Sequence, residues 1–131
     1  MGEPLIVLYD GDCRFCRAFA HVARRAARPP GVILLPFDHP RAERILAVLP
    51  EGARHVSVHA ADSRGLASAT HAFACILRRL RGGGMLLRTG AFRVYPWVAE
   101  HRNWFGRLVP DLPRPPIYPA PPPPPGARRT T

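Results

Sequence analysis

Residues 5–16 read Leu5-Ile6-Val7-Leu8-Tyr9-Asp10-Gly11-Asp12-Cys13-Arg14-Phe15-Cys16, and this stretch decides the fold of the 131-residue chain. The aliphatic run at its start predicts a short strand buried on both faces, and the Asp-Gly-Asp sequence predicts the turn that ends this strand. Beyond Cys13 the apolar residues recur at helical spacing, at Phe15, Phe19, Val22, Ala23 and Ala26. The pattern therefore predicts a helix whose first turn carries both cysteines.

The position of the two thiols predicts redox chemistry. The first turn of a helix presents unpaired backbone N–H groups and the positive end of the helix dipole, and both favour an anion such as a thiolate. Free cysteine has a pKa near ~8.5, which a helix N-terminus, a neighbouring Arg14 and a Cys-x-x-Cys arrangement each lower. Cys13 is therefore the candidate catalytic nucleophile. Cys16, one turn further along, is the candidate resolving thiol that displaces a mixed disulfide.

The residues of the turn are further candidates. Asp10 is a candidate catalytic residue that accepts a proton from the resolving thiol, or it only turns the chain by bonding to amides, and both interpretations stay open. Asp12 suits a helix cap better than a catalytic role, because Asp is favoured at that position. The candidate substrate-contacting or site-lining residues are Tyr9, Gly11, Asp12, Arg14 and Phe15.

The segment from Tyr9 to Cys16 resembles the motif of the thiol-disulfide oxidoreductase DCC family, in which Asp10, Cys13 and Cys16 form D-x-x-C-x-x-C. The similarity extends more weakly through Ala72 to Leu80 and Tyr95 to Arg102. This resemblance implies a thioredoxin-like fold and a redox role for the pair. The expected partners are a protein or small-molecule disulfide or thiol as substrate, together with an unidentified reductant or oxidant. We expect no cofactor.

The rest of the chain predicts the same fold without the motif. Val32 to Leu35 predicts a second buried strand, parallel to the first because a helix connects the two. A helix from Arg41 to Leu49, a strand over His55 to His59, a return strand over Leu66 to Ser68 and a helix over about Thr70 to Arg81 follow. A βαβ unit followed by a helix, a hairpin and a helix is the thioredoxin-like α/β arrangement.

The C-terminal third contains further predicted elements. Met85 to Arg88 predicts a short helix, and Pro96 suits the first turn of a last helix that covers the sheet and carries Trp97, Val98, Trp104, Phe105 and Leu108. Residues 1–109 are therefore predicted to form one thioredoxin-like domain. Residues 110–131 form a Pro-rich tail that is predicted to be extended or disordered, because proline cannot continue a helix or a ladder.

The charge and composition of the chain restrict the kinds of partner and the location that we expect for it. The net charge is +10, and all 19 basic residues are arginine. Such a charge attracts nucleic acid, anionic membranes or acidic partners, but the arginines are scattered and no binding motif accompanies them, so we expect no specific nucleic-acid binding. The N-terminal apolar run is too short for a signal peptide or a membrane span, which predicts a cytoplasmic protein without a membrane span. An odd number of cysteines argues against a structural disulfide scaffold.

Two alternatives to disulfide exchange remain open. One is a non-catalytic protein-interaction module on the same fold. The other is a metal site formed by Cys13 and Cys16. Zinc needs about four ligands, and His55 and His59 on one strand would lie about 13 Å apart, too far to bind the same ion. The third cysteine, Cys75, is predicted to be a buried small hydrophobe. If the pair is redox-active, stabilisation of its thiolate predicts a potential less reducing than that of thioredoxin.

Overall fold

The strand, turn and helix predicted at the N-terminus are present in the computed structural model, which describes residues 2–119 and 126. Strand β1 (Leu5–Tyr9) leads through the turn into helix α1 (Arg14–Ala26), and strand β2 (Val32–Pro36) follows. Strand β2 pairs with β1 in parallel, with Leu5 opposite Val32 and Tyr9 opposite Pro36. The expected βαβ unit is therefore confirmed.

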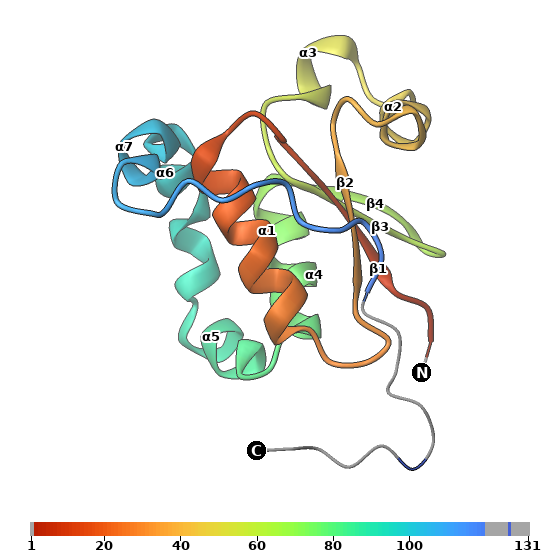
Figure 1. The fold of residues 1–131 in the computed structure, drawn as a ribbon, viewed down its shortest axis with the longest axis vertical. Coiled ribbons are helices and arrows are strands. Elements are labelled where there is room, and N and C mark those ends of the chain that lie inside the picture. The colour runs from red at the N-terminus through yellow and green to blue at the C-terminus, as the bar shows by residue number, and fades with distance from the viewer. Residues whose placement is uncertain (1, 120–125, 127–131) are drawn as a thin grey trace.

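A four-stranded mixed sheet organises the molecule, with the strand order β2-β1-β3-β4 (Figure 1). Strand β3 (His59–Asp62) pairs with β1 in the antiparallel sense, and β4 (Gly65–Ser68) pairs with β3 in the same way. This mixed α/β architecture agrees with the predicted thioredoxin-like fold. Because β1 is central, its carboxyl end places the Cys13 turn at the rim of the sheet.

Apolar side chains cover both faces of the sheet. On one face, residues of β1, β2 and β3 pack against α1 and α4 (Ala69–Arg79), and Val7, Leu34 and Ile76 are fully buried. On the other face, Leu8 and Leu35 pack against Ala42 and Leu46 of helix α2 (Pro40–Leu46). Burial of this apolar surface is the main favourable contribution to folding.

The strand expected over residues 55–59 is wrong in its position. Residues Glu51–Arg54 form the short helix α3, and the strand starts only at His59. Val56 is exposed, whereas His59 is fully buried. The backbone carbonyl of Arg54 and the hydroxyl of Ser68 lie 2.9 and 2.7 Å from the two ring nitrogens of His59. These hydrogen bonds satisfy a buried polar ring, which a hydrophobic pattern cannot identify.

The last helix predicted from Pro96 is two short helices. Helix α5 (Gly83–Thr89) and a 3-10 turn, η1 (Ala91–Val94), lead into α6 (Tyr95–Glu100) and α7 (Arg102–Gly106). The break falls at His101, whose backbone N–H bonds back to the carbonyls of Trp97 and Val98. Helix α7 packs on α1 and α6 packs on α4 (Figure 1), so they cover helices instead of the sheet.

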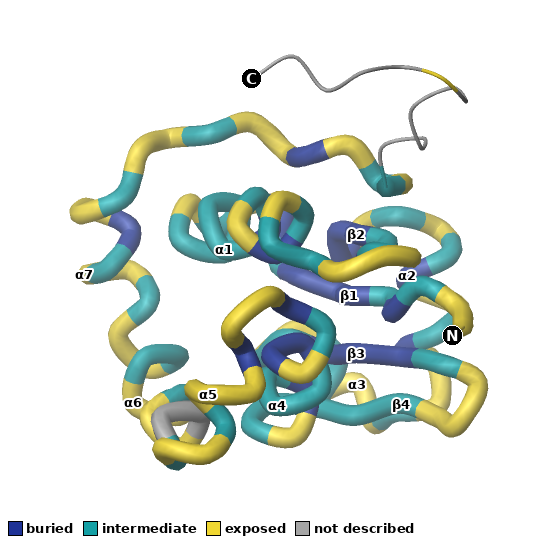
Figure 2. The backbone as a smooth tube through the Cα atoms, turned by 90° about the horizontal axis from the view of Figure 1, so that it is seen from below, coloured by how far each residue is buried: buried dark blue, intermediate teal, exposed yellow. Residues whose placement is uncertain are grey.

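Residues 110–119 contain no helix or strand and pass over α1 toward β2 (Figure 2). The backbone N–H of Leu34 donates to the carbonyl of Ile117 at 2.8 Å, so this segment pairs with the outer edge of β2. The tail that is predicted to be extended or disordered also includes residues 120–125 and 127–131, which lie outside the residues that the structure describes. The domain boundary at residue 109 stays a prediction.

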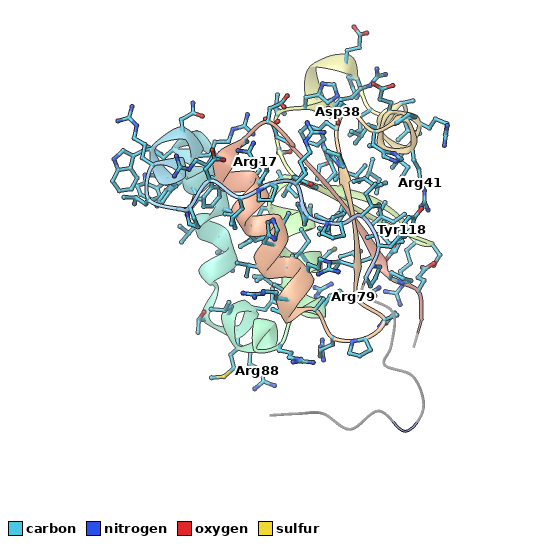
Figure 3. The ribbon with its side chains drawn as sticks, in the orientation of Figure 1. Arg17, Asp38, Arg41, Arg79, Arg88 and Tyr118 are labelled. Atoms are coloured by element: carbon cyan, nitrogen blue, oxygen red, sulfur yellow. The ribbon has the colours of Figure 1, made fainter. Side chains whose placement is uncertain are left out.

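Two further observations concern the surface. Arg41, Arg79 and Arg88 lie on different helices at separate places around the molecule (Figure 3), so the positive charge is spread. Within the described residues, no helix has both the length and the apolar character needed to cross a bilayer.

Candidate functional site

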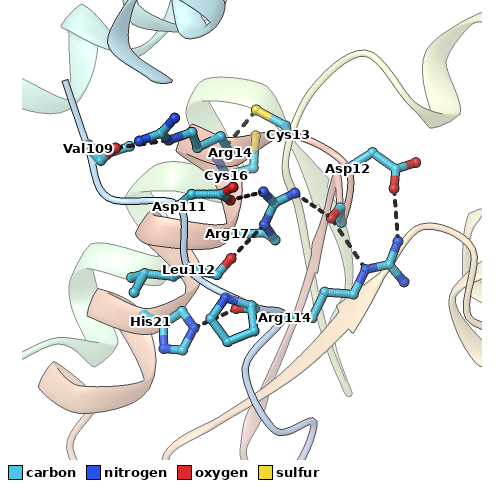
Figure 4. A network of polar contacts seen from close by, with 12 residues as sticks. Asp12, Cys13, Arg14, Cys16, Arg17, His21, Val109, Asp111, Leu112 and Arg114 are labelled. Atoms are coloured by element: carbon cyan, nitrogen blue, oxygen red, sulfur yellow. Dashed lines mark hydrogen bonds and ion pairs between the residues drawn. The ribbon is translucent and has the colours of Figure 1, made fainter. Parts of the chain in front are cut away.

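The turn after β1 fixes where the first cysteine lies. The Asp10 side chain accepts a hydrogen bond from the backbone N–H of Asp12 at 3.0 Å, and its carbonyl accepts one from Cys13 at 3.2 Å. Cys13 then takes the N-cap position of α1, and its Sγ accepts a hydrogen bond from the backbone N–H of Cys16 at 3.3 Å (Figure 4). The prediction that Asp12 caps the helix is therefore wrong, because Cys13 occupies the N-cap position and its own side chain accepts the capping hydrogen bond.

The two thiols differ sharply in acidity. A hydrogen bond from the Cys16 thiol, helped by the Cys16 backbone N–H and the charge of Arg102, lowers the pKa of Cys13 to about 6. The pKa of Cys16 is raised far above its usual range, chiefly because its thiol donates to Cys13 and because it is more deeply buried. Both thiols are free and half-buried. The site therefore holds one thiolate and one thiol at neutral pH.

Arg102 supplies the positive charge that sequence reasoning assigned to Arg14. It lies at the start of α7, and its Nη2 is 3.6 Å from Oδ2 of Asp10. Its charge lowers the pKa of Cys13 and of Cys16, whereas the charge of Asp10 raises both. The Arg14 Nε instead donates to the carbonyl of Val109 at 2.9 Å. Arg102 is the last residue of the segment Tyr95 to Arg102, which resembles the family. This resemblance was the only feature of the sequence that pointed to Arg102 as a site residue.

The other candidate residues surround the turn. The Gly11 carbonyl accepts hydrogen bonds from Arg17 and Arg114 at 3.1 and 3.3 Å. Arg114 also pairs with the exposed carboxylate of Asp12 at 3.1 Å. Phe15 packs its ring on Phe105 of α7, with the ring centroids 5.8 Å apart. Tyr9 is buried, and its hydroxyl has no hydrogen-bond partner among the described residues.

A pocket of about 430 Å³ adjoins the thiol pair, and Cys16 forms part of its wall. Five aromatic rings contribute to the lining, those of Tyr9, Phe15, Phe19, Phe73 and Tyr95. Aliphatic side chains from α6, from Val94 of η1 and from the segment before β3 complete the lining, together with Arg102. The sequence predicted only Tyr9 and Phe15 near the site. Phe19 was assigned to the apolar face of the helix, and Phe73 and Tyr95 come from distant parts of the chain.

Cys75, His55 and His59 have structural surroundings of their own. Cys75 is half-buried on α4 and packs against the main core. The ring of His55 stacks on Phe37 with centroids 5.1 Å apart, and His59 is held by Arg54 and Ser68. Within residues 2–119 and 126, no three His, Cys, Asp or Glu side chains are grouped so as to hold a metal ion. The described side chains thus bring only two thiols together.

Comparisons with known proteins agree with this geometry. A family model described as DCC1-like thiol-disulfide oxidoreductase matches residues 7–107, which include the end of β1, both cysteines and Arg102. No curated protein and no solved structure matches the chain.

Proposed function

Because the chain belongs to the DCC1-like thiol-disulfide oxidoreductase family, we propose that it exchanges disulfides through Cys13 and Cys16. The observation that carries this proposal is the Cys13 sulfur at the N-cap of α1, with its pKa lowered to about 6. A thiolate is the attacking form in disulfide exchange, and at neutral pH such a group is mostly ionised.

The proposed reaction proceeds in two displacements. The Cys13 thiolate attacks one sulfur of a substrate disulfide, a Cys13–substrate disulfide forms, and the other substrate sulfur leaves as a thiolate. Cys16 then loses its proton and attacks the Cys13 sulfur, which releases the second substrate thiolate. The substrate gains two electrons, and the protein is left with a Cys13–Cys16 disulfide. A thiol reductant restores the pair, or an oxidised partner drives the reaction in reverse.

The acidity of the pair suits this order. The hydrogen bond that the Cys16 thiol donates to the Cys13 anion is the main reason that the pKa of Cys16 is raised, and burial and the charge of that anion add to it. Formation of the mixed disulfide removes that anion, so Cys16 becomes easier to ionise at the step where it must attack. Asp10 is the carboxylate that influences both thiols, and we assign it the role of proton acceptor for Cys16, positioned by its ion pair with Arg102.

The flanking residues provide the surface that meets the substrate. Gly11, Asp12, Arg14 and Phe15 surround the cysteines on the turn and the first turn of α1, and Tyr9 lies beneath them. We assign them a substrate-contacting or site-lining role. Asp12 is exposed, so it is accessible to a docking protein.

Reduction of insulin disulfides by dithiothreitol tests the proposed function. The wild-type protein and the Cys75→Ser variant should both accelerate the reaction, because Cys75 lies away from the pair. The Cys13→Ser variant should show only the rate of dithiothreitol alone. Equal acceleration by wild type and Cys13→Ser would refute disulfide exchange and favour a non-catalytic interaction module.

A further inference from the structure

The pocket beside Cys16 adds information on the substrate. We propose that it holds a bulky apolar group carried close to the reacting sulfur of the substrate, so the preferred substrates are disulfides with an aromatic or branched aliphatic group. This inference rests on the proposed exchange function and deepens it. The same chemistry is available in a peptide with an apolar side chain beside its cysteine and in a small hydrophobic disulfide.

The walls of the pocket are held in place without a ligand. The rings of Phe19 and Phe73 lie 5.7 Å apart, and those of Phe73 and Tyr95 stack at 5.1 Å. The Tyr95 hydroxyl accepts a hydrogen bond from the backbone N–H of Val58 at 3.0 Å, which ties α6 to the segment before β3. A largely apolar pocket with fixed walls binds an apolar group without first paying for its own ordering.

The size and position of the pocket fit an apolar substituent on the reacting sulfur. A volume of about 430 Å³ falls within the usual range of small-molecule pockets, about 300 to 1,000 Å³, and is ample for one aromatic side chain. Cys16 lies in its wall, and Cys13 is one helical turn away, with its sulfur hydrogen-bonded to Cys16. A substituent on a sulfur joined to Cys13 therefore lies at the pocket.

The lining also selects against polar groups. Arg102 is its only charged side chain among the described residues, and that side chain is engaged by Asp10. A charged or strongly polar substituent would lose its hydration in a pocket whose lining is almost entirely apolar, which is unfavourable. Apolar groups gain by burial, so substrate choice should follow the apolar area next to the sulfur.

Matched disulfides test this inference on the full-length protein with dithiothreitol as reductant. One pair comprises the symmetrical disulfides of N-acetyl-Cys-Phe-amide and N-acetyl-Cys-Ser-amide, in which the leaving group is in each case the thiolate of an internal cysteine. The other pair, dibenzyl and bis(2-hydroxyethyl) disulfide, represents small molecules. We expect kcat/KM to be at least about tenfold higher for the apolar member, the discrimination that an apolar pocket typically achieves. If the apolar member is preferred only in the first pair, the substrates are peptides. If it is preferred only in the second pair, the substrates are small-molecule disulfides.

Two variants connect the preference to the pocket. Ala99→Phe fills part of the pocket, and Val94→Lys adds a charge at a lining position that is half exposed and so tolerant of substitution. Each should bring the ratio of kcat/KM values toward one. Val48→Phe adds the same ring at an exposed position on the other side of the sheet from α1 and should leave the ratio and the turnover unchanged. Thermal unfolding checks that each variant is folded.

Each outcome has a distinct meaning. Equal kcat/KM values for both members of both pairs would overturn the inference while leaving the proposed function intact. A preserved preference in folded Ala99→Phe and Val94→Lys would also overturn it. Reduction of none of the four disulfides, together with no effect on insulin, would count against the exchange function itself.

Discussion

The Cys13 sulfur takes the place of the side-chain oxygen that usually caps a helix. As a thiolate it accepts a charge-assisted hydrogen bond from the Cys16 N–H at the positive end of α1, and such bonds are stronger than neutral ones. As part of a disulfide the same sulfur is uncharged and accepts only weakly. The site therefore favours the reduced form, and we predict that the Cys13–Cys16 pair is more oxidising than the thioredoxin pair, whose potential is about −270 mV.

The pH dependence of alkylation tests the state of Cys13. Its reaction with iodoacetamide should follow the thiolate fraction, with a midpoint at about pH 6 and a decrease at lower pH as the sulfur is protonated. Cys16 should react far more slowly over the same range, because its pKa is raised while Cys13 is ionised and because it is the more deeply buried thiol. Peptide mass spectrometry separates the two sites. A Cys13 midpoint near ~8.5, as in free cysteine, would contradict the assignment.

Replacement of Arg102 tests its influence on the pair. Arg102→Gln removes a positive charge that favours the Cys13 thiolate and leaves the opposing charge of Asp10 without its partner, so the pKa of Cys13 should rise. We expect the Cys13 alkylation rate at pH 6 to fall about two- to fivefold, as befits a partly exposed charge interaction. Arg107→Gln, at the exposed C-cap of the same helix, is the matched control. A similar decrease of the alkylation rate in both variants would indicate an effect of net charge and would contradict a specific influence of Arg102 on Cys13.

At the scale of single elements, the sequence predicted the presence of a helix or strand more accurately than the residue at which it begins. Asp10, Asp12 and Cys13 are all able to accept a hydrogen bond at a helix start, and the choice depends on the backbone of the turn. The strand near residue 59 shows the same limit. Its alternating pattern began at His55, but Ala60 and Ala61 are the residues small enough to pack on both faces between β1 and β4.

The start of α5 provides a test of close backbone packing. A Cβ on Gly83 would lie 1.7 Å from the carbonyl oxygen of Leu77, a backbone atom in α4, whereas a Cβ on Gly84 meets nothing within 4 Å. Gly83→Ala should therefore destabilise the protein by about 2 to 4 kcal/mol, in the range of severe core substitutions. Gly84→Ala should be neutral or stabilising by up to about 1 kcal/mol. Urea unfolding measures both, and equal midpoints would contradict the packing described.

At the scale of the whole molecule, local patterns predicted the α/β topology, and long-range contacts supplied the rest of the site. Arg102 reaches the cysteines because α7 packs on α1. Phe73 and Tyr95 line the pocket beside Cys16 because α4 contacts α1 through Phe19 and because α6 packs on α4. Nothing in one-dimensional spacing identifies such neighbours, since they are set by tertiary packing. The cytoplasmic location and the absence of specific nucleic-acid binding stay predictions from composition.

The segment of residues 110–119 is held by one face of α1. Arg17 donates to the carbonyl of Leu112 at 2.8 Å and pairs with Asp111 at 2.7 Å, and His21 donates to the carbonyl of Pro113 at 2.7 Å (Figure 4). Because proline lacks an N–H but keeps its carbonyl, a Pro-rich segment presents acceptors that basic side chains can bind.

Substitution of Arg17 tests this attachment. Arg17→Gln removes an ion pair and weakens two hydrogen bonds to backbone carbonyls, so the free energy of unfolding should fall by about 1 to 3 kcal/mol. Cleavage by a protease within residues 110–119 should become faster. Arg25→Gln, at an exposed position on the same helix, is the control and should change neither quantity. Unchanged stability and cleavage in Arg17→Gln would show that the segment does not depend on these bonds.

Trapping of the mixed disulfide tests the central claim most directly. The Cys16→Ser variant should attack a substrate disulfide but fail to complete the second displacement, so a covalent Cys13–substrate adduct should accumulate. Non-reducing peptide mass spectrometry locates the adduct, and the wild-type protein should show an internal Cys13–Cys16 disulfide in its place. An adduct confined to Cys75, or no adduct on Cys13 at any time, would contradict the account.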